Sequence, residues 1–239
     1  MKKLYEKSEI WFAVLWIIIY VVSLSAADSV SESLGVLKSA TAPLSIILSV
    51  ILFVWIKKNN LSEKFGLCAF KGNLKNYLFF IPLVIIASVN TWNGVTLNMA
   101  VLESALYVLS MLGVGFLEEV IFRGFLFKAI CKTSIKRAVI ISSVTFGIGH
   151  IVNLLNGEGT FETLCQVCYA VAIGFVFTII FYKGKSLLPC IITHCVINSS
   201  STFGVEGTPA FQVIISIVLC AVSVGYALWI IKQEPEGGA

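Results

Sequence analysis

Long apolar runs recur from one end of this chain to the other, and they constrain its fold more than any other feature. A helix that crosses the roughly 30 Å of hydrocarbon in a bilayer needs about 20 mainly apolar residues, because each residue adds about 1.5 Å. The sequence holds about eight such runs, at 10–27, 43–56, 77–90, 99–127, 138–155, 164–182, 187–203 and 210–231. We therefore expect an all-α fold, a polytopic membrane helical bundle with about eight transmembrane helices.

The composition agrees with a membrane protein. Hydrophobic residues make up 58% of the 239 residues and charged residues only 13%, which a soluble domain does not tolerate. No linker rich in Pro, Ser or Gly separates the runs, so residues 1–239 are expected to form a single domain. A signal peptide is the alternative for the first run, but this run is longer than the usual apolar region of about 7 to 15 residues.

Basic residues fall in alternate connections between the runs. They are Lys2, Lys3, Lys7, then Lys57, Lys58, Lys64, Lys71, Lys75, then Lys128, Lys132, Lys136, Arg137, then Lys183, Lys185, and finally Lys232. Lys38 is the only basic residue in the intervening connections. Because short loops rich in Lys and Arg stay in the cytoplasm, both termini are predicted to be cytoplasmic. The net charge of +4 then reflects this bias and contact with anionic membrane lipids, and it does not indicate a nucleic-acid partner.

The seven cysteines show no spacing typical of a disulfide framework. Cys165 and Cys168 form a CxxC pair, which in a soluble fold can be redox-active or half of a metal site. No second pair accompanies them, so the favoured interpretation is that the cysteines are small apolar packing residues.

The segment FLEEVIFRGFLF, residues 116–127, places three charges inside a predicted span. Each charge near the middle of a spanning helix costs about 2.5 to 3.5 kcal/mol on insertion scales, so the cost needs a reason. Glu119 and Arg123 are four residues apart and can pair on one face of a helix. Glu118 points about 100° away from this pair and has no evident local partner. Gly113 and Gly115 precede the segment and permit close approach of another helix.

Both histidines of the chain also lie in predicted spans, His150 in TFGIGH and His194 in THCVIN. Asn198 follows His194 by four residues and shares its helical face. A hydrogen-bonded packing role is the alternative for either histidine. Counting about 1.5 Å per residue from the nearest basic residue places Glu118, Glu119, His150 and His194 in one layer. We expect this layer in the cytoplasmic half of the membrane, at the bottom of a polar cavity that opens toward the cytosol.

Two kinds of hydrolytic chemistry fit these residues. A buried carboxylate beside an imidazole can activate water as a general base, and a second imidazole with a carboxamide can donate hydrogen bonds to an oxyanion. Alternatively, Glu118, His150 and His194 can hold a zinc ion that polarises water and the peptide carbonyl. The sequence contains neither HExxH nor a GxSxG setting, and it does not choose between metal-free hydrolysis and zinc.

Three motifs occur in order and at compatible depths. They are EExxxR at Glu118, Glu119 and Arg123, FxxxH at Phe146 and His150, and HxxxN at His194 and Asn198. With them the chain resembles the CAAX protease and bacteriocin-processing enzyme (CPBP) family, also called the Abi family, which is related to the type II CAAX prenyl endopeptidases. The resemblance covers about residues 101–205, and residues 1–100 are expected to supply additional N-terminal transmembrane helices.

The resemblance implies an intramembrane endopeptidase whose site opens to the cytosol. By motif position it makes Glu118 the general base with His150 as its partner on the water, and His194 with Asn198 the oxyanion site. Glu119 and its arginine partner would order the helix, with a direct catalytic role for Glu119 as the alternative. The family is often described as metalloproteases, yet metal-free, glutamate-dependent hydrolysis is argued for its prenyl-protein members, so both remain open.

The resemblance leaves the substrate undecided. Short bacterial members are linked to bacteriocin immunity or to processing of signal peptides and bacteriocin-type peptides, and we expect a peptide or membrane-protein substrate in a bacterial plasma membrane. A non-proteolytic immunity or regulatory binding protein is an alternative. An ion-coupled transporter is a third class, since buried carboxylates and histidines also form proton relays, but the sequence shows none of the internal repeats typical of transporters.

Overall fold

The chain folds into helices, as the apolar runs predict. The computed structural model describes residues 1–155, 157 and 159–233. Within these residues extended backbone pairs only at an isolated antiparallel bridge between Val95 and Gly204. The all-α prediction is therefore confirmed.

Seven helical segments of the described residues are long and apolar enough to cross a membrane, which makes this a multi-pass membrane protein. They are Glu9–Ser33, Thr41–Lys58, Leu74–Thr91, Val101–Cys131, Ile135–Leu154, Thr160–Gly184 and Pro209–Lys232. They correspond to seven of the eight predicted runs, with ends that differ by a few residues.

The remaining run, 187–203, forms a shorter helix than expected. Helix α10 (Leu188–Ser200) has 13 residues and is followed by the 3₁₀ turn η4 (Ser201–Phe203). Thirteen residues cover only about 20 Å, which is less than the thickness of the hydrocarbon core. Ser200 and Ser201 donate hydrogen bonds from their hydroxyls to backbone carbonyls three residues earlier, an alternative to continued helix that serines commonly adopt.

The other helical elements, in chain order, are α1 (Lys2–Lys7), α2 (Glu9–Ser33), α3 (Thr41–Lys58), η1 (Leu74–Phe80), α4 (Ile81–Ser88), η2 (Val89–Thr91), α5 (Val101–Glu118), η3 (Glu119–Phe127), α6 (Lys128–Cys131), α7 (Ile135–Gly149), α8 (Val152–Leu155), α9 (Thr160–Gly184) and α11 (Pro209–Lys232).

Local sequence signals set several of the helix ends. Ser8, Ser134 and Thr208 cap α2, α7 and α11, each accepting a hydrogen bond from the backbone N–H three residues later. Lys185, with φ of 56°, ends α9 in the left-handed region.

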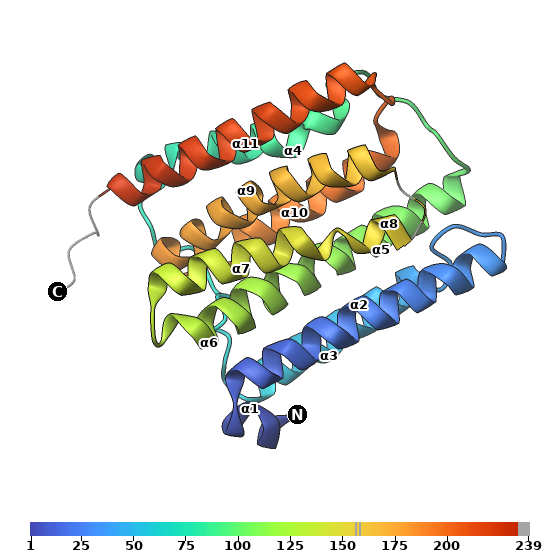
Figure 1. The fold of residues 1–239 in the computed structure, drawn as a ribbon. Helices are drawn as coiled ribbons and strands as arrows, with labels where there is room; N and C mark the ends of the chain where they lie inside the picture. Colours follow the sequence, from blue (N-terminus) through green and yellow to red (C-terminus); the bar gives the residue numbers. More distant parts are fainter. Residues whose placement is uncertain (156, 158, 234–239) are drawn as a thin grey trace.

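The helices pack in layers (Figure 1). Helices α11 and α4 cover one side of the bundle, α2 and α3 cover the other, and α5, α7, α9 and α10 lie between them. Helix α5 contacts α3 on one side and α10 on the other, and the segment η3 that continues it contacts α2 and α7. The motif EExxxR therefore lies in the interior of the bundle.

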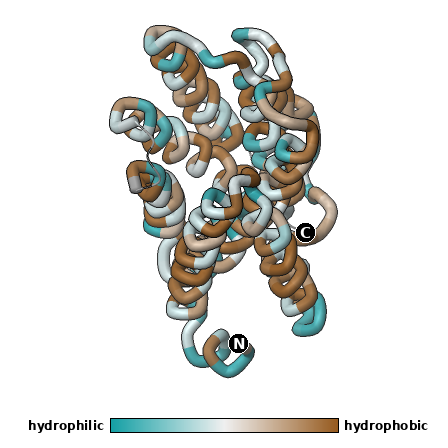
Figure 2. The backbone as a smooth tube through the Cα atoms, turned by 90° about the vertical axis from the view of Figure 1, so that its right-hand side faces the viewer, coloured by the Kyte–Doolittle hydropathy of each residue, from teal (hydrophilic) through white to brown (hydrophobic). Residues whose placement is uncertain are grey.

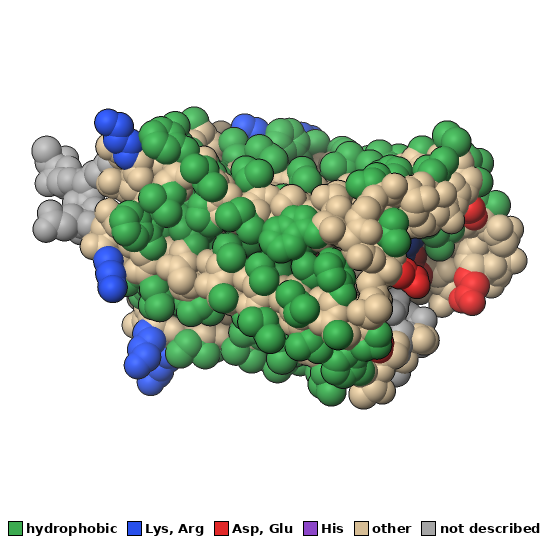
Figure 3. Space-filling view, turned by 90° about the horizontal axis from the view of Figure 1, so that it is seen from above, with side chains coloured by type: hydrophobic (Ala, Val, Ile, Leu, Met, Phe, Trp, Pro, Cys, Tyr) green, Lys and Arg blue, Asp and Glu red, His purple; other side chains and the backbone are tan. Residues whose placement is uncertain are grey.

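The two ends of the bundle differ in charge. The N-terminus, the C-terminal end of α11 and the turns after α3, α6 and α9 lie at one end of the bundle (Figure 1). We call it the basic end because these segments carry the predicted cytoplasmic lysines. The turns after α2, η2 and η4 lie at the other end, which we call the acidic end (Figure 1). Figure 3 shows Lys and Arg at the left end of one face and Asp and Glu at the right end. Lys38, the exception in the charge pattern, forms a 2.8 Å ion pair with Asp28.

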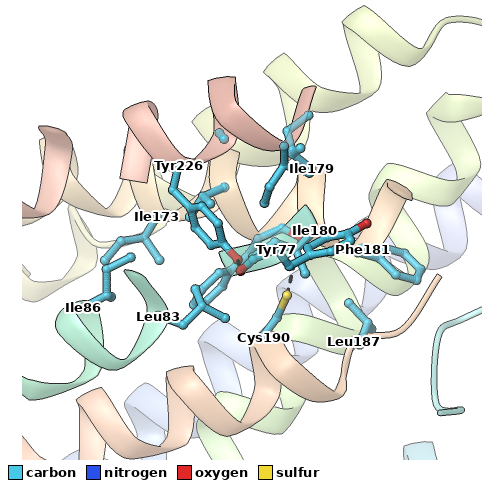
Figure 4. Close-up of a cluster of buried hydrophobic side chains, with 14 of the residues drawn as sticks. Tyr77, Leu83, Ile86, Ile173, Ile179, Ile180, Phe181, Leu187, Cys190 and Tyr226 are labelled. Carbon is cyan, nitrogen blue, oxygen red and sulfur yellow. Dashed lines mark hydrogen bonds between the residues drawn. The ribbon is translucent and has the colours of Figure 1, made fainter. Parts of the chain in front are cut away.

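Two hydrophobic clusters hold the layers together. Figure 2 shows hydrophobic residues along the helices, with hydrophilic residues mostly at the turns. One cluster joins α2 and α3 to η3 through buried residues such as Phe12, Leu52 and Phe125. The other joins α4, α9, α10 and α11 (Figure 4), and within it the buried Tyr226 donates a hydrogen bond to the backbone carbonyl of Tyr77.

Candidate active site

The carboxylates of the EExxxR motif lie where an α-helix becomes a π-helix. Helix α5 ends at Glu118, and η3 begins at Glu119 and continues with π-helical geometry to Phe127. All nine residues of η3 are buried. A π-helix is wider than an α-helix, is rare, and occurs frequently at functional sites. Sequence analysis predicted a helix here but not this change of geometry.

His194, on α10, lies between the two carboxylates. Its Nδ1 is 2.7 Å from Oε1 of Glu119, and its Nε2 is 3.1 Å from Oε2 of Glu118. All three side chains are at most 9% exposed. An imidazole can donate from both nitrogens only when both carry a proton, so this arrangement suits a charged ring between two carboxylates. Glu118, for which the sequence offered no local partner, therefore has one from another helix.

Arg123 pairs with Glu119, as the spacing of four residues predicts. Its Nη1 lies 3.0 Å from Oε1 of Glu119, and neither side chain is exposed at all. The guanidinium carbon lies 4.0 Å from the ring centroid of Phe146, a distance at which a cation is attracted to an aromatic face. Gly174 makes room for the guanidinium, since a Cβ there would lie 3.2 Å from Nη2 of Arg123.

Tyr20 is a site residue that sequence analysis did not find. It comes from α2, and its hydroxyl donates a 2.6 Å hydrogen bond to Oε1 of Glu118. One signal could have identified it, because membrane tyrosines concentrate at the two interfaces and Tyr20 lies near the middle of a 25-residue span. Its partner could not have been identified, because 98 residues separate it from Glu118.

The FxxxH motif brings His150 close to the buried carboxylates but not into direct contact with them. His150 follows the last residue of α7 and is partly exposed. Its ring packs edge-on to Phe146 at 5.3 Å between centroids, and Phe146 packs in the same way on His194 at 5.6 Å. His150 interacts electrostatically with Glu118, but the described residues offer its ring no hydrogen-bond partner.

Asn198, of the HxxxN motif, lies on α10 one turn beyond His194 and is partly exposed. Its backbone carbonyl accepts a hydrogen bond from Ser201, whereas its side-chain amide has no hydrogen bond to any described residue. The structure thus brings four of the six predicted site residues, Glu118, Glu119, Arg123 and His194, into direct contact. The side chains of the other two, His150 and Asn198, have no hydrogen bond to a described residue and can bind another molecule.

Several buried polar atoms of the cluster have no hydrogen-bond partner among the described residues. They are Oε2 of Glu118, Oε2 of Glu119, Nε and Nη2 of Arg123 and Oγ of Ser143. The contact of Glu118 Oε2 with His194 is at ion-pair distance but does not meet hydrogen-bond geometry. Buried polar groups are almost always satisfied, so these atoms mark a place that suits water or a polar group of a substrate.

The burial pattern points to access from the acidic end. His150 and Asn198, the partly exposed members, both lie on the acidic side of the buried carboxylates, since α7 and α10 run toward that end (Figure 1). Toward the basic end the side chains of Phe127, Phe181 and Leu187 are fully buried. The sequence analysis expected a cavity that opens toward the basic end, which is the predicted cytosolic end. The close packing of these side chains does not favour that direction.

The side chains do not form a ligand set for zinc. Among the described residues no group of three or more His, Cys, Asp or Glu side chains is arranged to hold a metal ion. Each ring nitrogen of His194 faces a carboxylate oxygen, and His150 and His194 each pack edge-on against the ring of Phe146. A zinc ligand needs a ring nitrogen whose lone pair points at the ion, so the predicted set of Glu118, His150 and His194 does not fit zinc in this arrangement.

Close packing of α5 on α10 fixes the carboxylates opposite His194. A Cβ on Gly115 would lie 2.8 Å from Sγ and 3.0 Å from the backbone nitrogen of Cys195, so only glycine allows this approach. A Cβ on Gly113 would lie 2.5 Å from Oγ of Ser45 on α3. The close approach predicted from these two glycines is confirmed.

Comparison with known proteins agrees with the motifs. Residues 100–200 match the model of a protein family described as type II CAAX prenyl endopeptidase, Rce1-like. The matched segment runs from the start of α5 to the end of α10 and contains all three motifs, whereas Tyr20 lies outside it. No curated protein and no solved structure matches the chain. The match confirms the resemblance for this part of the chain.

Proposed function

Because residues 100–200 match the family model described as type II CAAX prenyl endopeptidase, Rce1-like, we propose that the protein is an intramembrane endopeptidase that uses Glu118 to activate water. The observation that carries this proposal is the difference between the two Glu118 oxygens. Oε1 accepts a hydrogen bond from Tyr20, whereas Oε2 is buried, lies 3.1 Å from Nε2 of His194 and makes no hydrogen bond to a described residue. A general base needs a fixed carboxylate with one oxygen that can receive a proton.

The proposed reaction is hydrolysis without a covalent intermediate. Glu118 takes a proton from water, and the resulting hydroxide attacks the carbonyl carbon of the peptide bond. The side-chain amide of Asn198 donates a hydrogen bond to the oxyanion that forms. When the C–N bond breaks, Glu118 returns the proton to the leaving amine, so the carboxylate is regenerated and the water is divided between the two products.

The two histidines have different roles in this proposal. His150 is the partner of Glu118 on the water, because its ring is partly exposed and free of other hydrogen bonds to described residues. His194 holds Glu118 and Glu119 at fixed positions through its two nitrogens. This differs from the oxyanion role that motif position implies, because the ring nitrogens of His194 already face carboxylates.

We propose metal-free hydrolysis as the catalytic type. The support is the arrangement of the side chains as ion pairs, in which His194 has no nitrogen directed at a shared ligand position. Glu118, with His150 as its partner on the water, must then activate the water without a metal ion, which a carboxylate that is shielded from bulk solvent can do. An active enzyme under strong chelation is the expected result.

For the substrate we propose a signal peptide or bacteriocin-type peptide in a bacterial plasma membrane, with bacteriocin immunity as one outcome of its cleavage. This choice rests on the resemblance to short bacterial members of the CPBP family. The matched family is named for prenylated CAAX substrates, so a lipidated C-terminal peptide is the alternative that the experiment must separate.

The test compares peptide termini in membranes and medium from cells that express wild type or Glu118→Gln at equal protein levels. Glutamine keeps the size of the side chain and an oxygen that can accept from Tyr20, but it cannot take a proton from water. Glu6→Gln is the matched control, because this glutamate is exposed on α1 and forms only a 3.9 Å surface ion pair with Lys2. We expect new termini with wild type and Glu6→Gln that disappear with Glu118→Gln.

The outcomes separate the alternatives. Termini adjacent to a lipidated cysteine would identify a prenyl-type substrate, and termini in secreted peptides would identify the proposed one. Identical termini in all three strains, with a phenotype that Glu118→Gln retains, would refute proteolysis and favour a binding or immunity protein. Loss of cleavage by chelator, restored by added zinc, would refute the metal-free mechanism.

A further inference from the structure

Tyr20 approaches the candidate active site from the N-terminal part of the chain, outside the family match. Its hydroxyl lies 2.6 Å from Oε1 of Glu118 and donates to it. Apart from Tyr20, every side chain within hydrogen-bond or ion-pair distance of the two carboxylates belongs to η3 or α10, in the part of the chain that the structure describes. The first span therefore supplies a contact to the general base that no motif records.

We propose that Tyr20 is a positioning residue of the active site. By holding Oε1 of Glu118 it fixes the orientation of the carboxylate, with Oε2 on the side of Nε2 of His194, so that α2 is part of the catalytic unit and not only a membrane anchor. This inference rests on the proposed function, because it assigns Tyr20 a role through the general base.

The packing of α2 fixes the direction of the hydroxyl. Phe12, Trp16, Tyr20 and Leu24 recur every four residues and so lie along one face of the helix. Phe12, Trp16 and Leu24 are at most 7% exposed and belong to the hydrophobic cluster that α2 shares with η3. Phe12 packs on Phe125 of η3 with 5.0 Å between ring centroids. Tyr20 is the only polar side chain in this row, and its hydroxyl is directed at the carboxylate at the start of η3.

The chemistry of the contact suits positioning. A hydrogen bond from a neutral hydroxyl to a carboxylate is charge-assisted, and it is shorter and stronger than one between neutral groups. Tyr20 occupies one lone pair of Oε1, and Oε2 is left as the oxygen that makes no hydrogen bond to a described residue. Without this donor the carboxylate can rotate more freely about the last side-chain torsion of glutamate, because only the 3.1 Å contact of Oε2 with His194 then restrains it.

The test measures kcat and KM of Tyr20→Phe on the substrate identified by the termini experiment. Phenylalanine keeps the ring and its packing and removes only the hydroxyl. Because hydrogen bonds to charged groups contribute more than neutral ones, we expect kcat to fall about tenfold or more, with KM within about twofold of wild type. Trp16→Phe is the matched control, since it removes part of a ring one turn earlier on the same face, and we expect it to leave kcat unchanged.

Thermal unfolding in detergent checks that both variants fold. A folded Tyr20→Phe variant with the kcat of wild type would overturn the inference while the proposed function stands. An equal fall of kcat in Trp16→Phe would also overturn it, because the effect would then be one of packing. If wild type and Glu118→Gln give the same termini, the proposed function fails and the inference fails with it, and this result differs from the other two.

Discussion

The buried charge cluster predicts a large cost for removing Arg123. The ion pair with Glu119 has a separation of 3.0 Å, and both side chains are wholly buried. Arg123→Met keeps most of the length of the side chain but leaves the Glu119 carboxylate with His194 as its only partner among the described residues. Breaking a buried pair by removing one partner typically costs about 3–5 kcal/mol, because the remaining charge is left uncompensated.

A double variant separates the charge from the packing. In Glu119→Gln with Arg123→Met the negative charge is removed together with Arg123, so the desolvation cost of a carboxylate that has lost one of its two partners disappears. We expect the double variant to lose less stability than Arg123→Met alone, by about 1–3 kcal/mol. Lys2→Met is the control, since the Lys2–Glu6 pair is exposed and 3.9 Å apart, and we expect it to have no measurable effect.

The assay is the free energy of unfolding in detergent micelles, followed by tryptophan fluorescence during denaturant titration. Each single variant, the double variant and wild type are measured under the same conditions, and the interaction energy is taken from the cycle. A loss below about 1 kcal/mol for Arg123→Met, or a double variant whose loss equals the sum of the two singles, would refute the reasoning.

Two further predictions concern the oxyanion site and the orientation of the protein in the membrane. Asn198→Ala should lower kcat about 100-fold or more with little change in thermal stability, because its amide has no hydrogen bond to a described residue and is free for the oxyanion; an unchanged kcat would contradict this role. In a cysteine-free background, an impermeant maleimide added outside intact cells should label Glu206→Cys, in the connection at the acidic end, and not Lys58→Cys, at the basic end. The reverse pattern would show that the charge rule assigns the wrong side.

Local features of the sequence determined the architecture and one of the contacts in the site. Run lengths predicted the spans because a helix must cover the thickness of the hydrocarbon. The Glu119–Arg123 pair was predictable because residues four apart are neighbours on any helix, and the structure confirms it. The motifs were enough to indicate the family whose model residues 100–200 match. The separation of basic and acidic ends also followed from the sequence, because it depends only on the order of spans and loops.

Contacts between helices were decided by the tertiary structure alone. The hydrogen bond of Tyr20 to Glu118 depends on the rotation and depth of α2 relative to η3, and no spacing within the sequence encodes either quantity. Both carboxylates reach His194 because α10 places the imidazole between them, and the spacing of neighbouring residues on one helix does not predict this. The side from which the site is reached also depends on packing, because exposure of His150 and Asn198 is set by neighbouring helices. Sequence therefore determined which polar groups enter the membrane, and packing decided which of them meet.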